Sequence, residues 1–264
     1  MELLSERVVV QWRRTAKFAI PRMLAFFVTV TLYFTLIGKT ERSTVTSTIL
    51  KCLPIVTLWM FVLMSDFELK RSHRYKLLIL AGLVASCAGD LLLNYDLFEA
   101  GMGAFGVAQI FYVSAFGFRP LRPWVGLPLY GFAIAAVAIM FHNLPTLIKI
   151  CLPIYGALLV TMCWRSLARI DCFKNILRVA CGLGSVLFVI SDSIIAIDKF
   201  YTPVANAQTA IMVTYYVAQF GIALSVIEQS VTASGGAAAP KTANSSKQRQ
   251  NDEDEVDKHD IEQV

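Results

Sequence analysis

The stretch "LLILAGLVASCAGDLLLN", residues 77–94, is largely apolar and yet contains a carboxylic acid, Asp90. A bilayer core of about 30 Å requires roughly 20 apolar residues of α-helix, and this stretch approaches that length. An ionisable group inside such a helix costs roughly 2.5 to 3.5 kcal/mol on the insertion scale. The stretch therefore predicts a transmembrane helix and marks Asp90 as a residue with a specific role.

The composition of the whole chain indicates the same class. Its 264 residues are 56% hydrophobic and 16% charged, and the mean hydropathy is +0.59, outside the range of ordinary soluble proteins. We expect an all-α membrane protein with eight transmembrane helices. The apolar stretches are 18–38, 49–64, 76–96, 102–118, 124–141, 147–164, 176–197 and 207–227, of which 49–64 is the weakest because it is short.

The distribution of basic residues predicts the orientation. With eight crossings, both termini and the loops 65–76, 117–124 and 165–178 share one side. Without the C-terminal tail, this side holds fourteen Lys and Arg residues against three on the other. The positive-inside rule places this side, with both termini, in the cytosol. The first apolar stretch lacks a small-residue cleavage site, so we interpret it as a retained helix and not a signal peptide.

Three regions follow from this pattern. Residues 1–17 are predicted to be a basic cytosolic N-terminus, 18–228 the membrane domain, and 231–264 a disordered cytosolic tail, because the tail is too polar to bury a core. The net charge of +5 fits topology and lipid contact, not nucleic-acid binding. The six cysteines lack a C-x-x-C pair and are interpreted as small buried residues, not metal ligands.

The sequence contains an internal repeat. "KCLPI" at 51–55 recurs as "KICLPI" at 149–154, and a spacing of six and then two residues occurs twice: in Asp90, Asp96 and Phe98, and in Asp192, Asp198 and Phe200. We interpret residues 18–118 and 124–228 as two copies of a four-helix unit. Because each copy has four crossings, the two copies would have the same orientation in the membrane.

The repeat predicts a shared site. Asp90 and Asp192 each lie fourteen residues beyond a basic residue at the cytosolic boundary, or about 21 Å of helix. Both carboxyl groups are therefore expected at one depth, in the non-cytosolic half. Lys51 and Lys149 begin helices that enter from that side. These four residues predict a polar cavity walled by the second, third, sixth and seventh helices.

Two interpretations of the four charged residues remain open. The aspartates could pair with the lysines only to hold the bundle together, although buried ion pairs often contribute little net stability. Alternatively they serve catalysis or transport, because ionisable residues inside membranes usually mark function. Asp96 and Asp198 lie at helix ends, and we interpret them as interfacial caps.

The last helix of each repeat carries further polar residues. Gln109 and Tyr112 are three residues apart, as are Tyr216 and Gln219, so each pair shares a helix face. Tyr215 lies beside the second pair. These side chains are expected either to form hydrogen bonds between helices or to bind a headgroup or a water in the cavity.

The order and spacing of several motifs resemble the YhhN-type lysoplasmalogenase family. The motifs are "KCLPI", "GDLLL", "FGVAQIFY", "VLFVISDSIIAIDKF" and "TYYVAQFGIAL", and the resemblance covers roughly residues 20–228. It implies hydrolysis of the vinyl ether bond of lysoplasmalogens, without a metal or organic cofactor, in a membrane that we expect to be the endoplasmic reticulum. The chain departs from the family pattern at Gln109, where the family tends to have histidine, so no acid/base role is expected there.

The implied chemistry suits the expected cavity. Protonation of the vinyl ether carbon gives an oxocarbenium ion that water attacks, which requires one protonated carboxyl group and one carboxylate. Asp90 and Asp192 can divide these roles. Lys51 or Lys149 could bind the substrate phosphate, and Tyr112, Tyr215 or Tyr216 could orient the headgroup or water. The partners implied are the lysoplasmalogen and membrane lipids, with homo-oligomerisation left open.

Two other classes compete with this interpretation. A transporter or channel would also contain parallel repeats and charges near the midplane. An intramembrane aspartyl protease is suggested by "NYD" and "CGLG", but the paired aspartates lie in repeated contexts, which disfavours it. An enzyme should release fatty aldehyde in detergent, whereas a carrier needs two compartments to show activity.

Overall fold

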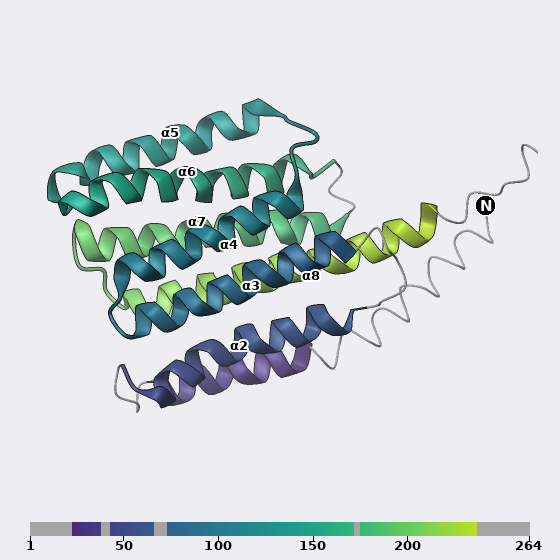
Figure 1. Cartoon of the computed structure of the whole chain (residues 1–264), viewed down its shortest axis with the longest axis horizontal. Helices are drawn as coiled ribbons and strands as arrows, with labels where there is room; N and C mark the ends of the chain where they lie inside the picture. The colour runs from purple at the N-terminus through teal and green to yellow at the C-terminus, as the bar shows by residue number, and fades with distance from the viewer. Residues whose placement is uncertain (1–22, 38–42, 66–72, 172–174, 237–264) are drawn as a thin grey trace, which may run out of the picture.

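The computed structural model describes residues 23–37, 43–65, 73–171 and 175–236, and these residues form a bundle of α-helices (Figure 1). A first helix, Met23–Leu36, overlaps the first predicted stretch. The other seven predicted stretches each correspond to one helix. These are α2 (Val45–Met64), α3 (His73–Asn94), α4 (Phe98–Phe116), α5 (Pro123–Met140), α6 (Thr146–Ala168), α7 (Ile176–Phe200) and α8 (Ala207–Gly236), with a short 3₁₀ helix, η2 (Phe141–Asn143), between α5 and α6.

The helices make this a multi-pass membrane protein. Within the described ranges, six helices are long and apolar enough to cross a bilayer: α2, α3, α5, α6, α7 and α8. Met23–Leu36 is shorter than a full crossing over its described residues, and α4 carries Glu99 and Gln109 among its apolar residues. The predicted cytosolic segment 1–17 lies outside the described residues, as does the tail from residue 237.

α8 extends beyond the last apolar stretch. The predicted stretch ended at residue 227, and the helix continues to Gly236. Adding a residue to an existing helix forms one further backbone hydrogen bond at low cost, so a helix can extend beyond its apolar part. Gly235 and Gly236, which disfavour helix, stand at its end.

Helix neighbours place the two halves of the chain against each other. α3 packs on α4 and α7 on α8, while α4 contacts α6 and α2 contacts α8 across the halves. The first helix packs against α8, because Phe26 stacks on Phe220 with ring centroids 5.1 Å apart. α5 lies at one edge of the bundle beside α6, far from α2 (Figure 1).

Glycines permit close contacts between helices in this packing, as two examples show. A Cβ on Gly82 would lie 2.2 Å from the ring of Tyr112, and a Cβ on Gly184 would lie 2.7 Å from the carbonyl oxygen of Ala218. Both distances are shorter than any normal contact, so α4 and α8 could not approach α3 and α7 as they do with alanine at these positions. The close approach brings the polar residues of α4 and α8 to the centre of the bundle.

Candidate active site

A polar cavity of about 260 Å³ lies where the ends of α3 and α7 meet the beginnings of α4 and α8. Asp90 and Asp192 both line it, as do Lys51 and Tyr215. Its other lining residues are Leu93, Asp96, Phe98, Phe105, Ser191, Ile195, Asp198, Lys199, Gln208, Ile211 and Met212. The walls are thus α2, α3, α4, α7 and α8, whereas the sequence predicted the sixth helix in place of α4 and α8.

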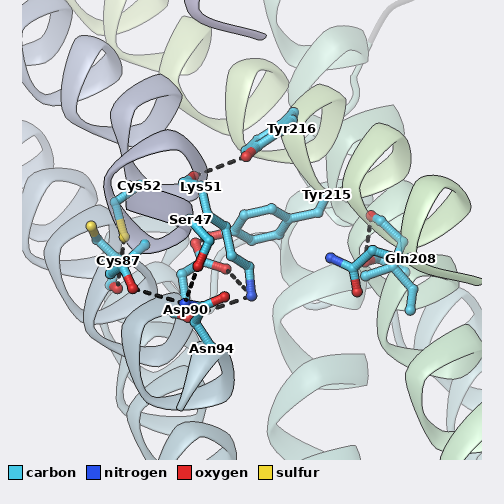
Figure 2. Close-up of polar contacts among 12 residues, drawn as sticks. Ser47, Lys51, Cys52, Cys87, Asp90, Asn94, Gln208, Tyr215 and Tyr216 are labelled. Atoms are coloured by element: carbon cyan, nitrogen blue, oxygen red, sulfur yellow. Dashed lines mark hydrogen bonds and ion pairs between the residues drawn. The ribbon is translucent and has the colours of Figure 1, made fainter. Parts of the chain in front are cut away.

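Asp90 is held by two elements other than its own helix (Figure 2). The Lys51 Nζ atom of α2 lies 3.6 Å from Asp90 Oδ1 and donates a hydrogen bond of 3.4 Å to the Asp90 carbonyl oxygen. The Tyr215 hydroxyl of α8 donates to Asp90 Oδ2 at 2.6 Å. Only 2% of Asp90 is exposed, so this carboxylate is enclosed by its partners.

The junction of α2 and α3 fixes the position of Lys51. Thr44 and Ser47 form a capping box at the start of α2, which satisfies free backbone donors. Asn94, at the end of α3, donates to the hydroxyl of Ser47 at 2.9 Å (Figure 2). It also donates to the hydroxyl of Thr48 at 2.8 Å. Lys51 therefore lies in the second turn of α2, not at its beginning as predicted, because this cap starts the helix at Val45.

Asp192 has a different environment. It is half-buried on α7, and the Tyr155 hydroxyl of α6 donates a hydrogen bond to its Oδ2 atom. Within the described part of the chain it forms no ion pair. Next to it, the Ser191 hydroxyl donates to the Ile211 carbonyl at 3.1 Å, which joins α7 to α8.

Lys149 is not among the residues that line the polar cavity. Its Nζ atom lies over the ring of Phe141, 5.4 Å from the centroid. Lys149 precedes the shared Cys-Leu-Pro-Ile by one residue more than Lys51 does, which rotates it by about 100° around the helix. The predicted equivalence of the two lysines is therefore corrected.

Four of the predicted binding residues lie in the core and not on the cavity. Tyr112 donates to Gln219 Oε1 at 2.8 Å, and Tyr216 donates to the Lys51 carbonyl at 2.8 Å. Gln109 is fully buried, and neither of its amide atoms has a hydrogen-bond partner among the described residues. Tyr112, Tyr216 and Gln219 thus form hydrogen bonds between helices, which was one of the two alternatives. Of the five polar residues predicted on the last helix of each repeat, Tyr215 alone lines the cavity.

Two residues at the site were missed by the sequence analysis. Tyr155 follows the second Cys-Leu-Pro-Ile directly, where the first copy has Val56, and this divergence between the repeats could have revealed it. Lys199 lines the cavity, and its Nζ atom lies 4.6 Å from the centroid of Phe98. It was counted only as a loop charge. Asp198 caps the turn after α7 as predicted, because its Oδ1 atom accepts from the Val204 amide at 2.8 Å.

The fold and the cavity define a class: a multi-pass α-helical membrane protein with two carboxyl groups, a lysine and a tyrosine around one polar space inside the bundle. The model of the YhhN family matches residues 46–226, and the chain belongs to this family. The resemblance that the motifs indicated is confirmed.

Relatives with assigned names are similar over most of their length. The chain is 36% identical to lysoplasmalogenase TMEM86A of Bos taurus over 214 residues, which cover 79% of this chain and 89% of the relative. The identity is 35% to the Homo sapiens TMEM86A over the same shares, and 32% to the Homo sapiens lysoplasmalogenase TMEM86B over 78% of this chain and 86% of that one. No solved structure matches the chain significantly.

Proposed function

We propose that this protein is a lysoplasmalogenase, which hydrolyses the vinyl ether bond of 1-alkenyl lysoglycerophospholipids. The products are a fatty aldehyde and glycerophosphoethanolamine or glycerophosphocholine. The names of the similar proteins support this activity. The observation that carries it is that Asp90 and Asp192, distant in sequence, line one cavity inside an apolar bundle.

The cavity supports a division of roles between the two aspartates. Lys51 lies beside Asp90, and an adjacent cation favours the ionised form of a carboxyl group. Asp192 is half-buried and has no such cation among the described residues, and partial loss of water without a compensating cation favours the neutral form of a carboxyl group. We therefore assign Asp192 as the general acid and Asp90 as the carboxylate that stabilises positive charge and accepts a proton from water.

The reaction then balances as follows. Asp192 gives its proton to the second carbon of the double bond, and the ether oxygen shares the positive charge with the first carbon. Water adds to the first carbon and gives a proton to Asp90, forming a hemiacetal. In the collapse of the hemiacetal, the bond between that carbon and the ether oxygen breaks, the hydroxyl group loses its proton to give the aldehyde, and the ether oxygen takes up a proton and leaves as an alcohol. The proton gained by Asp90 returns through solvent to Asp192, so the sum is ether plus water to aldehyde plus alcohol.

The substrate phosphate is assigned to Lys199. Lys51 is engaged by Asp90 and enclosed, with 8% of the residue exposed. Lys199 lines the same cavity, is exposed, and forms no ion pair with another described residue. An ammonium group of this kind binds phosphate as a point charge. Tyr155 and Tyr215 would orient the two carboxyl groups, because each hydroxyl donates to one of them.

The proposal extends to the topology. We retain eight crossings, two parallel four-helix repeats and cytosolic termini, in the endoplasmic reticulum membrane. Equivalent neighbours support the repeat, since α2 and α3 pack together as α6 and α7 do, and α3 and α4 as α7 and α8 do. Protease accessibility of tags at the two termini in sealed microsomes measures the orientation; protection of either tag would contradict it.

An aldehyde-release assay on the purified protein in detergent tests the activity. Lysoplasmalogen should give fatty aldehyde, whereas the saturated 1-alkyl analogue should give none, because only the vinyl ether can be protonated to an oxocarbenium ion. Equal cleavage of the two lipids would exclude this chemistry. Absence of aldehyde from the purified protein, together with lipid movement in a two-compartment assay, would favour the transporter.

A further inference from the structure

Asp192 lines two further spaces besides the polar cavity. One is a narrow constriction of about 40 Å³, which shares Phe98, Phe105 and Asp192 with the cavity. The other is an apolar groove of about 500 Å³ between α5, α6 and α7, which shares Tyr155, Asp192 and Ala196 with the constriction. The three spaces are therefore adjacent, and Asp192 is common to all of them.

The apolar groove lies on the side of the bundle where α5 covers α6. Phe132, Ala136 and Ile139 of α5 form one wall, and Leu152 of α6 and Val189 of α7 lie on the others. Phe132 is 51% and Ile139 64% exposed, so this wall also faces the outside of the bundle. In a membrane protein that outer face contacts lipid, and the groove is reachable from the bilayer.

The order of these spaces follows the order of groups in a lysoplasmalogen. The lipid has a charged headgroup, then the vinyl ether, then a long hydrocarbon chain. The path through the protein has a polar cavity with Lys199, then Asp192 with Tyr155, then the apolar groove. Asp90 borders the polar cavity but is not among the groove residues.

We propose that the alkenyl chain of the substrate lies in the apolar groove, with its vinyl ether at Asp192 and its phosphate in the polar cavity. This inference rests on the proposed function and deepens it, because it sets the direction in which the lipid binds. It also makes Asp192 the carboxyl group that can reach the carbon to be protonated.

The groove selects substrates by the length and shape of the alkenyl chain and contributes little to their binding affinity. Hydrocarbon chains of the bilayer are as apolar as the groove residues, so transfer of the chain from the membrane gains little free energy. A groove of this volume falls in the usual range of small-molecule sites, roughly 300 to 1,000 Å³. Filling part of it should therefore exclude long chains and admit short ones.

Two matched glycine substitutions test the proposal. Gly156 lines the groove and Gly131 of α5 does not, and a Cβ at either position would meet no atom within 4 Å. Gly156→Leu should lower kcat/KM for a long-chain 1-alkenyl lysophospholipid by roughly tenfold or more while changing that for a short-chain one less than twofold. Gly131→Leu should leave both substrates unchanged.

A second substitution and a labelling experiment keep the test decisive. Ala136→Phe fills the groove from α5 and should shift chain-length preference in the same direction. A saturated ether analogue with a diazirine at the chain end should label peptides of α5, α6 or α7. Equal loss of long and short substrates in both variants, or labelling confined to α2 and α3, would overturn the proposal. Wild-type turnover of the short substrate tests the proposed function separately.

Discussion

The two aspartates of the cavity differ in how completely the fold encloses them. Asp90 is 2% exposed and contacts a lysine and a tyrosine from two other helices. Asp192 is half-buried, contacts Tyr155, and adjoins the polar cavity, the constriction and the apolar groove. The repeated sequence motif thus supplies two similar carboxyl groups, and the surroundings make one enclosed and the other accessible.

The difference teaches that the two copies of the sequence motif differ at the residues that touch the carboxyl groups. In the first half, Lys51 precedes Pro54 by three residues, whereas Lys149 precedes Pro153 by four. In the second half, Tyr155 replaces Val56 after the shared motif. A carboxylate base requires a charged partner, as Asp90 has in Lys51. A general acid requires a neutral partner, as Asp192 has in Tyr155.

The largest expected effect is that of Asp192→Asn on catalysis. An amide cannot donate a proton to carbon, so turnover of lysoplasmalogen should fall by roughly 10²–10⁴-fold. Because Asp192 is half-buried and has no ion-pair partner among the described residues, the melting temperature in detergent should change little. Aldehyde release and thermal unfolding measure the two quantities. Full turnover by this variant would refute the assigned chemistry.

The second largest effect is on protein stability, and it distinguishes Asp90 from Asp192. Asp90→Asn should also lose turnover, but in addition it leaves the Lys51 ammonium buried without its carboxylate, at a cost of about 3–5 kcal/mol. Thermal unfolding should show this loss. The double variant Lys51→Met with Asp90→Asn should recover much of the stability and none of the activity. A melting temperature for Asp90→Asn equal to that of Asp192→Asn would remove the distinction between the two sites.

The smallest effect concerns the two lysines of the second half. Lys199→Gln should raise KM several-fold and leave kcat nearly unchanged, because it removes a phosphate contact that substrate and transition state share. Lys149→Gln is the matched control and should change neither constant, since Lys149 contacts Phe141 and not the cavity. Steady-state kinetics on lysoplasmalogen give both values. A larger KM change for Lys149→Gln would assign the phosphate to Lys149, one of the two lysines predicted from the sequence to bind it.

Hydropathy was sufficient to locate the helices, and the repeat was sufficient to locate the aspartates. A helix long enough to cross a bilayer must be apolar throughout, so its position is a local property of the sequence. Asp90 and Asp192 stand out because a carboxyl group in such a helix is costly. The prediction that both line one cavity follows from equal distances along equivalent helices, and the structure agrees.

The residues that contact these aspartates could not be predicted from the sequence in the same way. Which face a helix turns inward depends on the helices around it, and membrane helices are apolar on every side, so their sequence leaves rotation undetermined. The sequence therefore left open whether Tyr112 and Gln219 line the cavity or join helices, and the structure shows a core hydrogen bond between them. Lys149 looked like a second Lys51 and lies over an aromatic ring.

The sequence by itself determined the class of protein, the positions of its helices and the two carboxyl groups, because all of these depend on transfer free energies along the chain. The tertiary structure decided which groups meet. It paired Lys51 with Asp90, gave Tyr155 to Asp192, and opened Asp192 alone to the apolar groove. Those choices depend on the rotation of each helix about its axis, which only packing in three dimensions can set.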